Sequence, residues 1–175
     1  MKKLILASAL ILFSTAIYAK SIKIGIMAGP SEKVFEIARK IAKDKYHLEL
    51  QLVSFTDYQV PNEALNNGDI DLNIFQTKEF LDQSIENKAY DIAPIANTFV
   101  YPMGIYSTKI KSLKEINNNA TVIIPNDTSN QSRALKLLVQ ADLINLKKNK
   151  ENLYTVNDII HNTHNLDIVT MSAAQ

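Results

Sequence analysis

A strand–helix–strand pattern over residues 21–55 constrains the fold more than any other feature of the sequence. Residues 21–27 and 48–55 alternate apolar residues with small or polar ones, which is typical of β-strands. Between them Ser31 is placed to cap a helix whose apolar residues, from Val34 to Ala42, fall on one face. Two parallel strands need a crossover connection, and a helix usually supplies it. The sequence therefore predicts an α/β protein with a parallel sheet.

The alternation of strands and helices continues along the chain. We expect a first α/β lobe over residues 20–104 and a second, partial lobe over residues 105–175, with the change of lobe between residues 100 and 107. The second lobe has only two clear strands. The further elements predicted are a helix at 62–67 ended by Gly68, a strand at 68–76, a helix capped by Thr77, a strand at 91–100, a short helix with Ser112 and Glu115 as its capping box, a strand at 121–124, a helix at 129–143, a helix at 155–160 and a strand at 166–170.

The first 19 residues have the composition of a secretory signal peptide. Lys2 and Lys3 precede a mostly apolar run at 4–17, and Ala19 offers a cleavage edge before Lys20. The apolar run is too short for a confident membrane span, which needs about 20 residues. An uncleaved membrane anchor is the alternative. We expect a soluble secreted protein after cleavage.

Charge and cysteine content exclude several classes of protein. The chain has 19 Lys and Arg against 18 Asp and Glu, which argues against nucleic acid or an anionic membrane as the main partner. It has no cysteine. It therefore has no disulfide framework, no thiolate metal site and no thiol nucleophile, and no cysteine for a lipid anchor.

Arg133 stands where a helix favours an acid. It lies in or beside the first turn of the predicted helix at 129–143, where a cation is unfavourable by roughly 0.3–1 kcal/mol. A ligand carboxylate would remove this penalty, because the guanidinium fork and the free N–H groups of the helix end both bind anions. Two alternatives are that Arg133 faces solvent or that it pairs with a nearby acid such as Asp127.

Five aromatic residues lie near predicted loop ends. Such rings can hold an apolar ligand side chain, and a thioether makes soft contacts with ring edges worth about 0.3–1.5 kcal/mol. Ordinary core packing is the alternative for each ring. The five are Tyr58, Phe75, Phe80, Phe99 and Tyr101.

Catalytic patterns are weak in this sequence. His161 and His164 are three residues apart and would share a helix face, but no third metal ligand lies near them in the sequence. No phosphate-binding loop or nucleophile motif is present. We therefore expect no catalytic residues, no metal site and no cofactor.

Several segments, taken in order, resemble the methionine-binding (MetQ/NlpA-type) family, the substrate-binding proteins of bacterial ABC importers. The segments are IKIGIMAGP, FTDYQVPNEALNNGDIDLNIFQ, IANTFVYPMGIYS, IKSLKEI and VIIPNDTSNQSRALKLL. The resemblance implies a type II periplasmic binding protein, a monomer whose two lobes close over L-methionine or a related amino acid. It also implies an ABC permease in the inner membrane as the partner.

The resemblance implies six ligand-binding residues. Arg133 would pair with the carboxylate of the amino acid, with Asn130 beside it, while the rings of Tyr58, Phe75 and Phe80 would line the side-chain pocket. Thr77, the sixth, stands where the family commonly has histidine, and Phe80 stands where it commonly has tyrosine. These departures leave open a different ligand, such as another small amino acid or a short peptide.

Members of this family continue well beyond the counterpart of Gln175. The resemblance therefore implies an amino-terminal fragment with an incomplete second lobe. A secreted fragment that binds no ligand and acts only through its surface is a further alternative.

Overall fold

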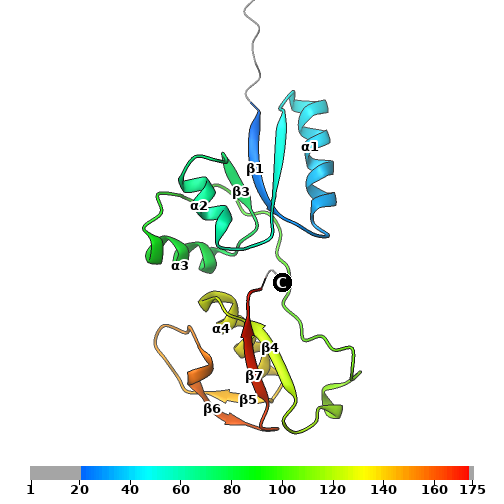
Figure 1. The fold of residues 1–175 in the computed structure, drawn as a ribbon, viewed down its shortest axis with the longest axis vertical. Coiled ribbons are helices and arrows are strands. Elements are labelled where there is room, and N and C mark those ends of the chain that lie inside the picture. The colour runs from blue at the N-terminus through cyan, green and yellow to red at the C-terminus, as the bar shows by residue number, and fades with distance from the viewer. Residues whose placement is uncertain (1–20, 174–175) are drawn as a thin grey trace, which may run out of the picture.

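The computed structural model describes residues 21–173, and the predicted signal peptide lies outside this range. Figure 1 shows two lobes that follow one another along the chain and are joined by an extended segment. The first lobe holds β1 to β3 and α1 to α3, and the second holds β4 to β7 and α4. No helix among the described residues is long and apolar enough to cross a membrane.

The first lobe is built on a three-stranded parallel sheet in the order β2-β1-β3. The predicted strand–helix–strand unit is confirmed, with α1 as the crossover between β1 and β2. The strand predicted at 68–76 is much shorter in the structure. The elements are β1 (Ile22–Met27), α1 (Glu32–Tyr46), β2 (Leu50–Phe55), α2 (Val60–Asn66), β3 (Leu72–Ile74) and α3 (Lys78–Lys88).

Helix α1 covers one face of this sheet through a single buried side chain. Phe35 packs against Ile24 and Ile26 of β1. Of the apolar face predicted for this helix only Phe35 is buried, while Val34 and Ile37 are exposed, Ile37 to 63%. The sheet beneath α1 is only three strands wide, so it reaches only part of the helix.

The predicted side-chain cap of α1 is also absent. Ser31 precedes the helix but makes no capping hydrogen bond, and its backbone already lies in the α region. An N-cap residue usually has an extended backbone, which lets its side chain turn back to the free N–H groups.

The other face of the sheet packs tightly around Gly25. A Cβ at this position would lie 2.7 Å from Ile70 Cδ1 and 3.0 Å from the ring of Phe55. Helix α2 lies on this side, where the Asn73 side chain donates a hydrogen bond to the Pro61 carbonyl. The absence of a side chain at Gly25 therefore lets the segment around Ile70 pack directly on β1.

The segment between the lobes contains no strand, so the strand predicted at 91–100 is wrong. Val100 is 87% exposed and Ile95 is similarly open to solvent. Alternation of apolar residues makes a strand only where a neighbouring edge supplies hydrogen bonds, and this segment pairs with none. It runs in extended form from one lobe to the other (Figure 1).

The predicted capping box at Ser112 forms only in part. Ser112 Oγ accepts a hydrogen bond from the Lys114 N–H at 3.3 Å, at the start of the 3-10 helix η1 (Leu113–Glu115). The Glu115 carboxylate, however, accepts from the Lys111 N–H instead of returning to Ser112. Of the two hydrogen bonds of a capping box, only the one accepted by the Ser112 side chain is therefore present.

The second lobe contains four short strands in two sheets. Strands β4 and β7 pair in parallel, while β5 and β6 pair antiparallel. Leu135 on α4 is 0% exposed and lies at the centre of the core with Leu138 and Ile144. The elements are β4 (Thr121–Pro125), α4 (Thr128–Gln140), β5 (Ile144–Leu146), the 3-10 helix η2 (Val156–Asp158), β6 (Ile159–Asn162) and β7 (Asp167–Met171).

The helix predicted at 155–160 is a single 3-10 turn that passes directly into β6. Thr155 and Asp158 form a capping box at its start, and the Asp158 carboxylate accepts hydrogen bonds from the Thr155 N–H and hydroxyl. This local cap explains why the sequence resembles a helix start. The pairing of β6 with β5 then stops the helix from continuing.

One face of the β4–β7 pair is open to solvent. Ile123 of β4 lies beside Val169 of β7, and both side chains are exposed, as is that of Met171. Parallel sheets are usually covered on both faces. Only the face toward α4, which carries Ile124, is covered in the described residues.

We predict that Leu135→Ala lowers the free energy of unfolding of the second lobe by about 2–5 kcal/mol, because it leaves a cavity in a packed core. Urea denaturation followed by circular dichroism measures the change. Leu137→Ala, on the same helix but at a partly exposed position, is the matched control and should cost much less. Equal losses in the two variants would contradict the assignment of the core.

Candidate functional site

A cavity of about 780 Å³ lies between the two lobes, and all six predicted ligand-binding residues line it. The first lobe contributes Tyr58, the turn between β3 and α3 and the start of α3, and the second contributes the end of β4 and the first turns of α4. The connecting segment forms a third wall. The lining residues are Tyr58, Phe75, Gln76, Thr77, Lys78, Glu79, Phe80, Ala96, Asn97, Thr98, Phe99, Val100, Tyr101, Pro102, Met103, Pro125, Asn130, Arg133 and Ala173.

Strand direction explains why these turns meet. The cavity lies at the carboxyl ends of β3 and β4, where open α/β sheets generally bind their ligands. The turn at residues 28–31, between β1 and α1, does not line the cavity. The role of the six predicted residues in binding stays a prediction, although the fold brings them together.

Three aromatic rings form one wall of the cavity. The ring centroids of Tyr58 and Phe75 are 6.0 Å apart, and Phe80 lies edge-on to both rings, at 6.2 Å from Tyr58 and 5.9 Å from Phe75. Phe80 is only 5% exposed, so it serves core packing as well as the cavity. These spacings are typical of stabilising aromatic pairs. The wall is therefore mostly apolar.

A second pair of rings comes from the connecting segment. Phe99 and Tyr101 meet edge to face at 5.1 Å, and Phe99 also contacts Phe35 of α1 at 6.0 Å. Both residues of the pair line the cavity. The extended segment is thus anchored to the first lobe by Phe99.

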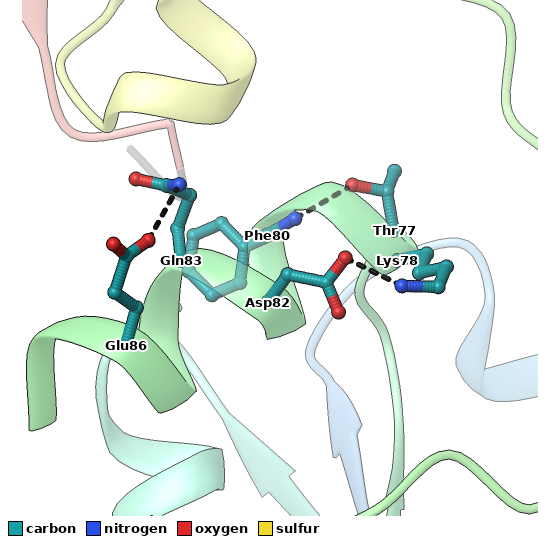
Figure 2. Close-up of polar contacts among 6 residues, drawn as sticks. All are labelled: Thr77, Lys78, Phe80, Asp82, Gln83 and Glu86. Atoms are coloured by element: carbon teal, nitrogen blue, oxygen red, sulfur yellow. Dashed lines mark hydrogen bonds and ion pairs between the residues drawn. The ribbon is translucent and has the colours of Figure 1, made fainter. Parts of the chain in front are cut away.

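Thr77 ends the β3–α3 turn and caps α3, as predicted. Its hydroxyl accepts a hydrogen bond from the Phe80 N–H at 3.2 Å, which Figure 2 shows. In the same view Lys78 reaches along the helix to Asp82 at 2.5 Å. The hydroxyl oxygen of Thr77 is therefore engaged in folding the turn.

Lys78 and Glu79 also line the cavity, and the sequence patterns did not predict them. Both directly follow the cap residue Thr77, in the first turn of α3. A helix cap at the carboxyl end of a strand was the available signal. It marks the whole turn and not the single residue.

A network of amide side chains fixes this turn from behind. Asn62 of α2 is 1% exposed and forms two reciprocal hydrogen bonds with Gln76, each 2.7 Å long. Asn73 donates to the same Asn62 oxygen at 3.0 Å. Buried amides that satisfy one another in this way hold a backbone in a single conformation. The network therefore holds the turn between Phe75 and Thr77 in place.

Arg133 reaches the cavity from the first turns of α4. Its Nη1 donates to Asn130 Oδ1 at 2.8 Å, and its Nη2 lies 3.5 Å from the Tyr101 carbonyl oxygen. In residues 21–173 no acid forms an ion pair with Arg133. The predicted alternative of an ion pair with Asp127 is therefore wrong. Because a guanidinium has five N–H donors, several remain for a ligand.

Asp127 caps the same helix. Its Oδ1 accepts a hydrogen bond from the Asn130 N–H at 2.8 Å. Its charge lies near the phenol of Tyr58 in the other lobe. Burial, and then the charge of Asp127, raise the pKa of Tyr58 above its ordinary value of 10.0. The neutral phenol is therefore the favoured form at the cavity wall.

The described residues contain no group of three or more histidine, cysteine or acidic side chains able to hold a metal ion. His161 lies in β6 and His164 in the following turn, so the idea that they share a helix face is wrong. The His164 ring instead contacts the Asn118 side chain at 3.2 Å.

We predict that the phenol of Tyr58 titrates above pH 10 and that Tyr58→Phe removes this titration. The raised pKa favours the protonated folded state, so its contribution to stability is present below pH 10 and is lost as the pH rises further. A spectrophotometric titration of tyrosinate measures the pKa. Asp127→Asn should lower the pKa of Tyr58 and still leave it above 10, since burial is the larger cause. A value at or below 10 in the unmodified protein would contradict the burial of this group.

Known proteins similar to this chain point to a single family. The model of the NlpA lipoprotein family matches residues 22–175. The D-methionine-binding lipoprotein MetQ of Escherichia coli is 48% identical over 154 residues, which cover 88% of this chain and 57% of the relative. Outer membrane lipoprotein 3 of Mannheimia haemolytica is 46% identical, with 99% of this chain and 68% of the relative covered. The chain thus spans about three fifths of the length of these relatives.

Solved structures agree with the sequence comparisons. The crystal structure of the methionine-binding protein MetQ has a TM-score of 0.85 at 48% identity, covering 87% of this chain and 62% of that chain. A nutrient-binding protein of Burkholderia cenocepacia, solved bound to methionine, has a TM-score of 0.84 at 41% identity, covering 88% of this chain and 65% of that chain.

These likenesses confirm two predictions. The chain has the α/β fold of the type II periplasmic binding proteins, of which it spans a part. The matched family is one of substrate-binding proteins and not of enzymes. On the evidence of the family model and of relatives that share nearly half of its residues, the chain belongs to the NlpA lipoprotein family.

Proposed function

We propose that this chain binds methionine in the cavity between its lobes. The observation that carries the proposal is the arrangement of Arg133, with donors to spare at the amino end of α4, facing a cavity whose other wall is three aromatic rings. An amino acid with an apolar side chain has the matching chemistry, an acid group at one end and an apolar group at the other. The cavity volume lies in the range of known ligand pockets, about 300–1,000 Å³.

The carboxylate of the amino acid would bind to Arg133, whose guanidinium is held by a hydrogen bond to the Asn130 side chain. Charge-assisted hydrogen bonds of this kind are about twice as strong as neutral ones. The thioether would lie against Tyr58, Phe75 and Phe80, where sulfur contacts ring edges favourably. The names of the relatives support methionine as the ligand, and the Escherichia coli protein is named for the D enantiomer.

In the transport role that we propose, the protein works in the periplasm after removal of residues 1–19. It is a monomer whose lobes, residues 20–104 and 105–175, close on the ligand through a hinge at about 100–106. The closed form then docks on an ABC permease of the inner membrane. One solved relative is described as a periplasmic substrate-binding protein of an ABC transporter, which supports this role.

A second candidate ligand is another small apolar amino acid or a short peptide. Thr77 uses its hydroxyl oxygen to cap α3, and Phe80 brings no polar atom, so this wall of the cavity offers few groups that would select one side chain. Sites that select strictly place polar groups against the ligand, and an apolar wall discriminates by shape alone.

We predict that Arg133→Ala weakens methionine binding by about 1.5–3 kcal/mol, the cost of losing hydrogen bonds to a charged group. Isothermal titration calorimetry measures the affinity of the full chain. The matched control is Arg39→Ala, which removes the exposed arginine that pairs with Glu36 on α1, far from the cavity residues. Unchanged affinity in Arg133→Ala would reject the role assigned to Arg133.

A thermal-shift screen distinguishes the candidate ligands. We expect L- or D-methionine to raise the melting temperature more than leucine, alanine or a dipeptide. At equal concentration, the ligand that binds the folded state most tightly stabilises it most. A larger shift with a different amino acid or a dipeptide would favour the second candidate. A melting transition that no compound moves would favour a chain that acts only through its surface.

A further inference from the structure

We infer that Asp127 is a positioning residue, which sets the orientation of the Arg133 guanidinium by fixing the amide of Asn130. The inference deepens the proposed function and rests on it, because it concerns the group proposed to bind the carboxylate. Three residues from the first two turns of α4 and its cap form the relay. Its links are hydrogen bonds between neighbouring turns of a single helix.

The first link is the carboxylate of Asp127, which uses both oxygens on Asn130. Its Oδ1 accepts from the Asn130 N–H at 2.8 Å, which is the helix cap. Its Oδ2 accepts from Asn130 Nδ2 at 3.2 Å. The cap alone needs only one oxygen, so the second bond is additional to helix capping.

The second link is the polarity of the Asn130 amide. An amide side chain has one accepting end and one donating end. Because the carboxylate accepts from Nδ2, the amide must turn Oδ1 the other way, and this oxygen accepts from Arg133 Nη1 at 2.8 Å. The reverse orientation would set oxygen against carboxylate and the NH₂ group against the guanidinium.

Asp127 acts on the cavity through its neighbours in α4. Asn130 and Arg133 line the cavity, whereas Asp127 does not. The other contact of Arg133, from Nη2 to the Tyr101 carbonyl, is 3.5 Å long and so is weak. The bond to Asn130 is therefore the main restraint on the guanidinium, and Asp127 decides whether that bond can form.

Two substitutions separate this role from helix capping. Asp127→Asn keeps the shape and the capping oxygen but puts an NH₂ group against Asn130 Nδ2, which favours turning the amide over. Asp127→Ser also keeps a strong cap but removes the oxygen that accepts from Asn130 Nδ2, so it takes away the second bond without loss of the cap. Arg133→Ala tests whether the effect passes through the guanidinium.

The primary measurement is nitrogen-15 NMR of the arginine guanidinium groups of the full chain. The sequence has only two arginines, and Arg39 is the internal reference. We expect slowed rotation of the Arg133 guanidinium in the unmodified protein, faster rotation in Asp127→Ser, which lacks the second oxygen, and the fastest rotation in Asp127→Asn. This measurement needs no ligand, so it decides the inference even if methionine proves not to bind.

The second measurement is methionine affinity by calorimetry. We expect Asp127→Asn to weaken binding about tenfold, Asp127→Ser to weaken it by much less, and Asp127→Asn to have no further effect in an Arg133→Ala background. Unchanged guanidinium rotation in Asp127→Asn would overturn the inference. Rotation that stays as slow in Asp127→Ser as in the unmodified protein would also overturn it and leave Asp127 as a helix cap only. Failure of the unmodified protein to bind methionine would reject the proposed function instead.

Discussion

Parallel pairing of short strands is the constraint on which the rest of this molecule depends. Strand β1 pairs in parallel with both β2 and β3, and β4 pairs in parallel with β7. Each parallel pair requires a crossover, and the cavity lies where the carboxyl ends of β3 and β4 face each other. Neither lobe alone forms the site, because the first carries the three rings and the second carries the cation. The cavity is thus a product of strand direction in two separate sheets.

The same constraint leaves apolar surface open. A parallel sheet normally has both faces covered, yet the outer face of β4 and β7 carries Ile123 and Val169 in solvent. On the first lobe Ile37 of α1 is likewise exposed. Burial of apolar surface stabilises a fold by about 25 cal/mol per Å². The exposed faces are not buried, so they add nothing to the stability of the described residues. The described residues therefore form two small cores, one around Ile26 and one around Leu135, each with an uncovered side.

Local patterns in the sequence predicted the elements whose partners are local. The caps at Thr77 and at η1, the crossover from β1 to β2 and the helix that carries Arg133 all follow from residues close together in the chain. The strand predicted at 91–100 does not form, because strand pairing depends on a sheet edge that is distant in the sequence. Alternation of apolar residues gives no information about that edge. The sequence pattern placed the apolar residues of α1 on one face but did not show that only Phe35 would be buried, because burial depends on how wide a sheet lies beneath the helix. Convergence of the six site residues came from the family resemblance, since no local pattern relates Tyr58 to Arg133.

The position of Arg133, which is unfavourable for a helix, becomes consistent once its neighbours are known. A cation beside the amino end of α4 is opposed by the helix dipole, and the carboxylate of Asp127 at the cap offsets this locally. The offset is indirect, because Asn130 stands between the two charges and bonds to both. A direct ion pair would occupy some of the guanidinium donors and offset the positive charge that attracts an anion. Inserting a neutral amide keeps the cation available while its orientation is held, and this arrangement suits a site that must bind an anion and later release it.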